Sequence, residues 1–123
     1  MAFNWREYLF FARFTKDLAD KDFSREASQR CAVSRAYFAA FCCARNFAVA
    51  NGFVIRDGDD RAKIHTQIRE HFRKDAPRRH LAGSLDRLRQ WRNNCDYDNE
   101  VPNIEFVVEG SFREAEKILD SVK

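Results

Sequence analysis

Apolar side chains recur every three or four residues along most of this 123-residue chain, which is the spacing of amphipathic α-helices. The first such run extends from Asn4 to Ala19. A second, longer run follows Ser24, a residue typical of N-caps, and continues to Gly52. Small side chains within it favour close approach by a neighbouring helix, so we expect this helix to be the central one. They are Ala36, Ala39, Ala40 and Ala44.

The middle of the chain predicts a loop and then a short helix. Residues 53–60 contain turn-forming Asp and Gly without sustained periodicity, so we expect a loop that also caps the next helix. Ile64, Ile68 and Phe72 then recur at intervals of four. This third helix should end before Pro77, because proline disfavours helical geometry in the residue ahead of it.

Two more helices complete the pattern. The apolar positions of the fourth are Leu81, Leu85, Leu88 and Trp91. It runs into a polar segment at 88–97, and residues 99–102 form a break. A last helix carries apolar positions from Ile104 to Leu119, although Gly110 weakens its middle by roughly 1 kcal/mol relative to alanine.

Composition supports the same fold class. A chain of 123 residues suits one domain, and 33% charged and 45% hydrophobic residues with 4 Gly and 2 Pro favour helices over short strands. The expected fold is all-α, a single domain over 1–123 that forms an up-and-down bundle of about five helices with one broken arm. No stretch approaches the roughly 20 apolar residues of a membrane span, so we expect a cytoplasmic protein that does not enter a membrane.

The cysteines do not predict a metal site or disulfides. The four are Cys31, Cys42, Cys43 and Cys95, without a C-x-x-C pair. The first three lie in an apolar helical pattern, where reduced cysteine behaves as a small buried hydrophobe, so a reducing cytoplasm fits. Since no Gly-rich phosphate loop or Ser-His-Asp order is present either, we expect neither metal nor cofactor.

Charge is unevenly distributed along the chain. Residues 61–94 hold ten basic side chains against three acidic ones, a net charge of +7, and also all three histidines, His65, His71 and His80. Residues 95–123 hold eight acidic against three basic side chains, a net charge of −5. The basic block would attract a polyanion such as RNA in a salt-dependent way. Alternatively, these residues form solvated helix faces, or the two blocks neutralise one another when packed.

The segment 88–97 reads L-R-Q-W-R-N-N-C-D-Y and concentrates polar groups where a helix ends. Arg89 and Arg92 are three residues apart, and Arg92 and Asp96 are four apart, so all three share one stripe of the helix. Leu88 and Trp91 lie on another stripe. The polar stripe is suited to a phosphate or an acidic partner.

Two segments together resemble HEPN domains. Residues 32–41, A-V-S-R-A-Y-F-A-A-F, followed by Ala44 and Arg45, resemble the central helix of that family. Residues 92–97, R-N-N-C-D-Y, resemble the R-x-x-x-D-Y ending of one HEPN branch, and His65 with Phe72 matches a weaker feature of the same branch. The resemblance covers most of the chain, from about residue 5 to residue 97.

The resemblance implies a helical bundle that commonly forms a homodimer with an arginine motif from each subunit in a shared cleft. Many members are metal-independent ribonucleases of toxin-antitoxin or antiviral systems, whereas others are inhibited by a small nucleotidyltransferase antitoxin that modifies a tyrosine. The ribonucleases carry a histidine after the arginine, at a position that corresponds here to Tyr97, Asp98 or Asn99. A phenol with a pKa of about 10 is a poor general base near pH 7, so Tyr97 does not simply replace the histidine.

Each candidate residue of the polar segment has a functional and a structural interpretation. Arg92 would contact the scissile phosphate, or it would pair with Asp96 at the helix end. Asn93 would line a phosphate pocket or satisfy open carbonyls. Tyr97 would bind RNA, receive a nucleotide, or pack against the central helix with its hydroxyl satisfied, and we favour packing. Arg89 would line the same cleft.

Two candidates lie outside that segment. Arg35 is expected to form a buried ion pair with Asp96 and so to order the site. His65 is the only histidine that the resemblance supports as a proton carrier, although a helical histidine is more often a surface or satisfied polar residue. Aromatic residues such as Phe38 and Phe41 are interpreted as core.

Two functions follow as hypotheses. The first is a cytoplasmic HEPN-like homodimer that binds or cuts RNA, with metal-free attack by a ribose 2′-hydroxyl and Arg92 stabilising charge on the phosphate. The second is a non-catalytic interaction module that partners a small nucleotidyltransferase antitoxin. A third, structural alternative is that the Arg92 cluster only fixes a dimer.

Overall fold

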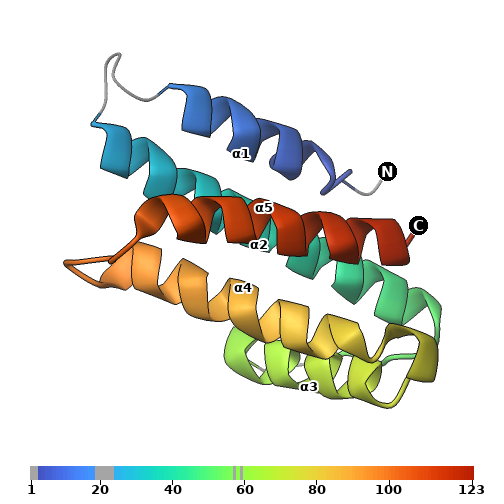
Figure 1. Ribbon diagram of the computed structural model, residues 1–123. Coiled ribbons are helices and arrows are strands. Elements are labelled where there is room, and N and C mark those ends of the chain that lie inside the picture. The colour runs from blue at the N-terminus through green and yellow to red at the C-terminus, as the bar shows by residue number, and fades with distance from the viewer. Residues whose placement is uncertain (1–2, 19–23, 57, 59) are drawn as a thin grey trace.

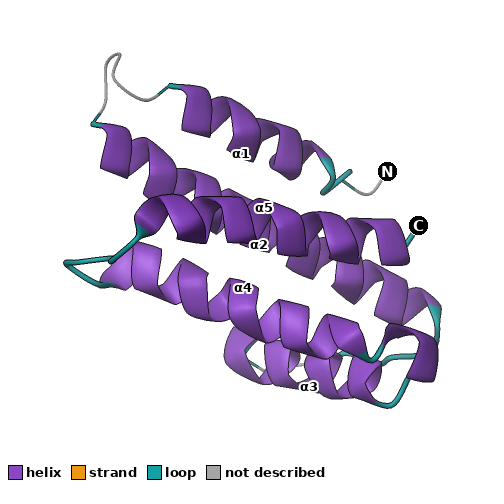
Figure 2. Ribbon diagram, viewed as in Figure 1, coloured by secondary structure: helices purple, strands orange, loops and turns teal. Residues whose placement is uncertain are grey.

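A computed structural model describes residues 3–18, 24–56, 58 and 60–123, and all regular structure in these residues is helical (Figures 1 and 2). The α-helices are α1 (Glu7–Asp17), α2 (Arg25–Ala50), α3 (Arg61–Arg73), α4 (His80–Tyr97) and α5 (Ile104–Ser121), and the 3-10 turn η1 (Ala76–Arg78) follows α3. The predicted all-α bundle of five helices is confirmed for this part of the chain.

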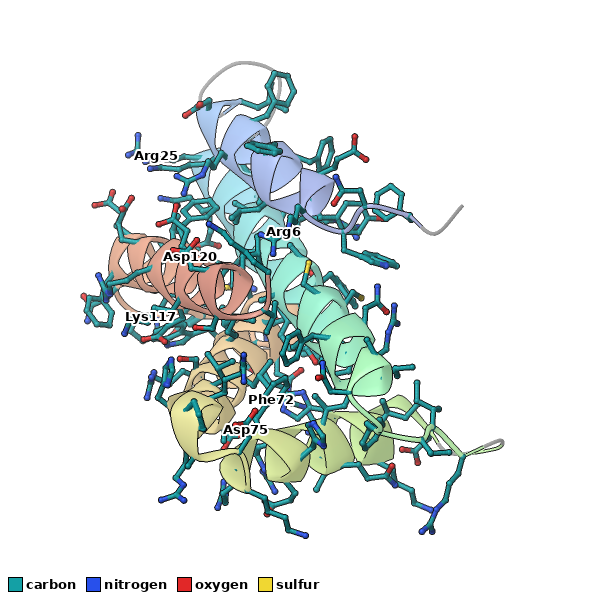
Figure 3. The ribbon with its side chains drawn as sticks, turned by 90° about the vertical axis from the view of Figure 1, so that its right-hand side faces the viewer. Arg6, Arg25, Phe72, Asp75, Lys117 and Asp120 are labelled. Carbon is teal, nitrogen blue, oxygen red and sulfur yellow. The ribbon has the colours of Figure 1, made fainter. Side chains whose placement is uncertain are left out.

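Helix α2 lies at the centre of the bundle and contacts each of the other α-helices. Figure 1 places α1 and α3 on opposite sides of the molecule, with α4 and α5 between them beside α2. Successive helices run in opposite directions except α2 and α3, which point the same way in that view. Figure 3 shows α3 lying obliquely across the lower end of the bundle, which is the interruption in the up-and-down order.

Helix starts follow the predicted capping residues. The Ser24 hydroxyl accepts a hydrogen bond from the Ala27 amide at 3.1 Å, and an Asp60 oxygen accepts one from the Lys63 amide at 2.8 Å. These bonds satisfy backbone donors that have no partner inside the helix. The expected end of the first helix, Ala19, lies outside the described residues, as do two of the five residues at 56–60.

Small residues let the helices pack closely, as the alanines of α2 predicted. All four of them are completely buried. On α5, Gly110 has the same role, because a Cβ added there would lie 2.7 Å from Cη2 of Trp91. The indole ring of α4 therefore occupies the space that a side chain at 110 would need, which explains a glycine in the middle of a helix.

Arginines from other elements bind the carbonyl ends of two helices. Arg30 of α2 donates to the carbonyl oxygens of Cys95 at 3.0 Å and Asp98 at 2.6 Å, at the end of α4. Arg6 donates to the Leu119 carbonyl of α5 at 2.8 Å. Since these carbonyls have no partner within their own helix, each guanidinium neutralises a polar helix end.

The apolar surface of α1 is only partly buried, and the burial expected for Cys31 is wrong. Phe10, Phe11 and Phe14 of α1 are exposed, Phe10 to 71%, so α1 buries only one side of its apolar surface. Cys31 is exposed rather than buried, whereas Cys42 is buried as expected. Among the described helices, none is long and apolar enough to cross a membrane.

Candidate functional site

A cavity of about 640 Å³ opens between α2, α3 and the C-terminal half of α4. Three arginines and four aromatic rings contribute to its wall, and no acidic side chain lines it in the described part of the chain. The lining residues are Tyr37, Phe38, Phe41, Cys42, Arg45, Ile55, Ala62, Ile64, Arg89, Arg92 and Tyr97. The wall therefore combines positive charge with aromatic surface.

Helical periodicity explains why these residues meet. Tyr37, Phe41 and Arg45 are spaced four apart and lie on one stripe of α2. Arg89 and Arg92 are three apart on α4 and lie on one stripe of that helix. Because α2 and α4 pack against each other, both stripes border the same space.

Arg92 is held by its own helix. Its Nε atom lies 2.8 Å from Oδ2 of Asp96, and Nη1 donates to Oδ1 of Asn93 at 3.1 Å. The Nε atom is buried and makes no aligned hydrogen bond, so the contact with Asp96 is an ion pair rather than a bidentate fork. The Ser34 hydroxyl of α2 donates to the same carboxylate oxygen at 3.4 Å. Asp96 thus orients Arg92, as the sequence predicted.

Aromatic rings surround the Arg92 guanidinium. Its Cζ lies 5.3 Å from the ring centre of Phe38 and 5.7 Å from those of Tyr37 and Tyr97. Each distance is within the range of a cation–π interaction. The arrangement fixes the position of the cation while leaving it only partly neutralised by one carboxylate.

Arg89 makes no ion pair or hydrogen bond with any residue that the structure describes, although it borders the cavity. Arg45, in contrast, donates to Oδ1 of its neighbour Asn46 at 3.1 Å and lies 5.6 Å from the ring centre of Trp5. Arg89 is therefore the cation whose donors remain available to a bound anion.

His65 lies behind the wall of the cavity. Its side chain is 1% exposed, its Nδ1 lies 3.1 Å from the Tyr37 hydroxyl, and its ring stacks on Phe41 at 5.6 Å. Its Nε2 has no hydrogen-bond partner and lies 3.7 Å from Oδ1 of Asp86. The histidine is therefore separated from the cavity by Tyr37 and Phe41.

Burial is the largest influence on the pKa values of His65 and Tyr37. Burial, reinforced by the positive charge of Arg89, lowers the pKa of His65 to about 4, while Asp86 acts in the opposite direction. Burial also raises the pKa of Tyr37 to about 12, although Arg89 and Arg92 lower it. Both side chains are neutral near pH 7.

The structure gathers Arg89, Arg92, Asn93, Asp96 and Tyr97 at the end of α4. The packing expected for Tyr97 is wrong, because its side chain is 73% exposed at the mouth of the cavity. Helix α4 ends at this residue.

The ion pair expected between Arg35 and Asp96 is also wrong. Arg35 lies 5.7 Å from the ring centre of Tyr8 and 5.8 Å from that of Phe38. It faces α1, so cation–π contacts replace the expected carboxylate. Asp96 is held by Arg92 and Ser34 instead.

Sequence reasoning missed three wall residues. Phe41 was interpreted as core, and Tyr37 and Arg45 entered through the family resemblance. Tyr37 is buried in the core and Phe41 packs against it, and all three also border the cavity. Their spacing of four was visible in the sequence. It identifies one stripe of a helix, but it does not identify whether that stripe faces a cavity or a neighbouring helix.

Comparison with protein-family models, curated proteins and solved structures finds no significant match for this chain. Within the described residues, no group of three His, Cys, Asp or Glu side chains is arranged to hold a metal ion. The geometry of the cavity is therefore the basis for a functional proposal.

Proposed function

We propose that this chain is a HEPN-like, RNA-directed protein that binds one unpaired nucleotide of an RNA strand in the arginine-lined cavity. The observation that carries the proposal is Arg89, a cation without a described ionic partner in a cavity without a described acidic wall residue. Phosphate satisfies such a cation, because guanidinium donors match its oxygens in geometry and charge.

Cavity size and wall chemistry support a nucleotide as the ligand. Small-molecule sites commonly enclose roughly 300–1,000 Å³, and the cavity, at about 640 Å³, lies inside that range. Phe38, Phe41 and Tyr97 offer aromatic surface on which a base stacks. A paired base is already stacked within its duplex, so the ligand is a single strand or a loop.

The geometry supports binding more strongly than cleavage. Attack of a 2′-hydroxyl on the adjacent phosphorus transfers a proton to a base and expels the 5′-oxygen of the next nucleotide. Arg92 is placed to stabilise the negative charge that develops on the phosphate. No histidine lies among the described wall residues, and His65 is buried behind Tyr37.

The test is the affinity for a short fluorescent single-stranded RNA, measured by anisotropy at several salt concentrations. Arg89→Ala should weaken binding about tenfold and reduce the slope of log affinity against log salt by about 0.7. Arg113→Ala is the matched control, since Arg113 is an exposed arginine of α5 that does not line the cavity. Equal effects of the two substitutions would show that the cavity is not the binding site.

The same variants separate binding from cleavage. Wild-type protein and Arg89→Ala are incubated with total RNA in EDTA, and RNA integrity is read on a gel. Degradation by wild type alone would extend the function to metal-independent ribonuclease. Intact RNA in both, combined with Arg89-dependent binding, would leave an RNA-binding protein.

A second candidate function is a partner module for a small nucleotidyltransferase antitoxin. The observation that favours it is the exposed phenol of Tyr97 beside the arginine cavity, where it is accessible to a modifying enzyme. Transfer of a nucleotidyl group to this hydroxyl would release pyrophosphate and add a negatively charged group. Mass spectrometry of the protein from its native cells tests this, and unmodified Tyr97 in the presence of the transferase would contradict it.

The proposed RNA-directed function includes the homodimer that the family resemblance implies. Light scattering of the purified protein at several concentrations measures its mass. A monomer at all concentrations would contradict a shared cleft between two subunits, while binding by the cavity of one chain would still be measurable.

A further inference from the structure

The buried part of the cavity wall contains the Tyr37 hydroxyl, which is paired with His65. The Tyr37 hydroxyl lies 3.1 Å from Nδ1 of His65, and the imidazole is clamped by its stack on Phe41. Which group donates depends on which imidazole nitrogen carries the proton. The surroundings of the second nitrogen decide this.

Asp86 favours a proton on the far nitrogen of His65. Nε2 faces the Asp86 carboxylate at 3.7 Å, and a protonated nitrogen is attracted by that negative charge. Nδ1 is then unprotonated and accepts a hydrogen bond from the Tyr37 hydroxyl. The phenol oxygen keeps free lone pairs, the Cζ atom of Arg92 lies 5.7 Å from the centre of the phenol ring, and Arg89 lines the same cavity.

The charged side chains of the cavity wall can donate hydrogen bonds but cannot accept them. Arg45, Arg89 and Arg92 have donors and no acceptors, so they match a phosphate. The Tyr37 oxygen, whose own proton is engaged by His65, is an acceptor. A matching ligand therefore carries an anionic group next to a hydroxyl donor. A ribonucleotide has this combination, because its 2′-hydroxyl neighbours the 3′-phosphate, and a deoxyribonucleotide lacks it.

We propose that the Tyr37 oxygen accepts a hydrogen bond from a ribose 2′-hydroxyl, and that His65 positions Tyr37 for it, so that the cavity selects RNA over DNA. The inference rests on the proposed function, since it requires a nucleotide in the cavity. It assigns direct ligand contact to Tyr37 and a positioning role to His65.

The experiment compares the affinities of one sequence synthesised as RNA and as DNA, at a single salt concentration. Wild-type protein should prefer RNA. Tyr37→Phe should reduce the RNA-to-DNA affinity ratio about three- to tenfold, the worth of one hydrogen bond, without weakening DNA binding. Tyr8→Phe is the matched control, because it removes the phenol hydroxyl of an α1 residue that does not line the cavity. That variant should keep the wild-type ratio.

A positioning role for His65 predicts a specific change in the RNA-to-DNA affinity ratio. His65→Leu should lower the RNA-to-DNA ratio as Tyr37→Phe does, because the phenol loses the acceptor that orients its proton. A merely structural role would weaken RNA and DNA binding equally and leave the ratio unchanged, which would overturn the assignment of His65.

A second measurement uses wild-type protein alone and does not depend on how the variants fold. RNA with 2′-fluoro groups keeps an RNA-like sugar shape but cannot donate from that position. Its affinity should fall to that of DNA. Retention of full RNA affinity would overturn the inference, because the site would then recognise sugar shape rather than a donor.

The outcomes distinguish the two proposals. Wild-type protein that binds neither nucleic acid would remove the proposed function and this inference with it. Equal binding of RNA and DNA, through Arg89, would keep a nucleic-acid site and overturn only the role of Tyr37. An RNA preference that is unchanged in Tyr37→Phe would also keep the nucleic-acid site and overturn the role of Tyr37.

Discussion

The buried imidazole of His65 should make the stability of this protein fall between neutral pH and pH 5. Burial lowers the pKa of His65 in the folded state to about 4 from an ordinary value of 6.5, so the folded protein binds fewer protons than the unfolded chain. The stability that this difference contributes is fully present above pH 6.5. It is lost progressively as the pH falls towards 4.

The size of the effect follows from the two pKa values. The full difference corresponds to about 3 kcal/mol, at about 1.4 kcal/mol for each tenfold change in proton affinity. Integrating only from about pH 7.5 to pH 5 gives a loss of about 2 kcal/mol. Burial is the largest cause of the lowered pKa, and the charged groups that act on His65 are Arg89 and Asp86 of α4 and Arg69 of α3. Tyr37 of α2 contacts the imidazole through its hydroxyl.

The assay is urea unfolding at the two pH values for wild type and His65→Gln. The variant has a lower starting stability but no titrating imidazole at this position, so its loss on acidification should be about 2 kcal/mol smaller. His80→Gln, at an exposed position, removes a histidine without disturbing the core and serves as the control. An equal pH dependence in wild type and His65→Gln would refute the argument, as would an NMR titration that places the pKa of His65 above 6.

Three further substitutions test the packing around the site. Gly110→Ala should destabilise the protein by about 1 kcal/mol in urea unfolding, because the Cβ contact with Trp91 outweighs the gain in helix propensity, and it should stabilise a Trp91→Leu background. Arg30→Lys should accelerate hydrogen exchange at the end of α4 more than elsewhere, because lysine cannot bind several carbonyls at once; uniform acceleration would contradict this. Glu114→Gln should cost about 2 kcal/mol in thermal unfolding, since it weakens a buried hydrogen bond of 2.6 Å from Ser84, and a neutral effect would show that the carboxylate is not needed.

The helices were predictable because their signals are local. The apolar spacing of Ile64, Ile68 and Phe72 and the caps at Ser24 and Asp60 depend on residues within one or two turns of each other. Such signals predicted the five helices and the break near residue 100. They contain no information about which helix packs against which.

Errors at the candidate site arise from that missing information. Arg35 and Tyr37 lie two residues apart on α2, and the sequence does not show that one faces Tyr8 of α1 while the other borders the cavity. Tyr97 was expected to pack because tyrosines in bundles commonly do. Whether it is covered depends on which side of α4 it occupies in the assembled fold, and there it is 73% exposed.

Charge patterning was only partly informative for the same reason. The acidic final segment does neutralise part of the basic block, as in the contact between Arg87 and Glu114 at 3.2 Å. Other acidic residues of α5 pair with α1, including Glu109 with Lys16 at 2.9 Å. The sequence predicted an excess of positive charge, whereas only the fold shows that Arg89 borders the cavity without a described ionic partner.

This division between neutralised and available arginines bears on how the cavity would bind a phosphate. Arg92 is already oriented by Asp96 and surrounded by rings, so it needs little reorganisation when an anion arrives. Arg89 provides donors that no described acidic side chain competes for, and it does so beside the neutral phenol of Tyr37. Because Arg30 holds the end of α4 to α2, the geometry of both arginines is coupled to the central helix. A phosphate would therefore meet Arg92, which is already ion-paired, and Arg89, which has no described ionic partner, and this arrangement favours binding of an anion over a purely structural role at the end of α4.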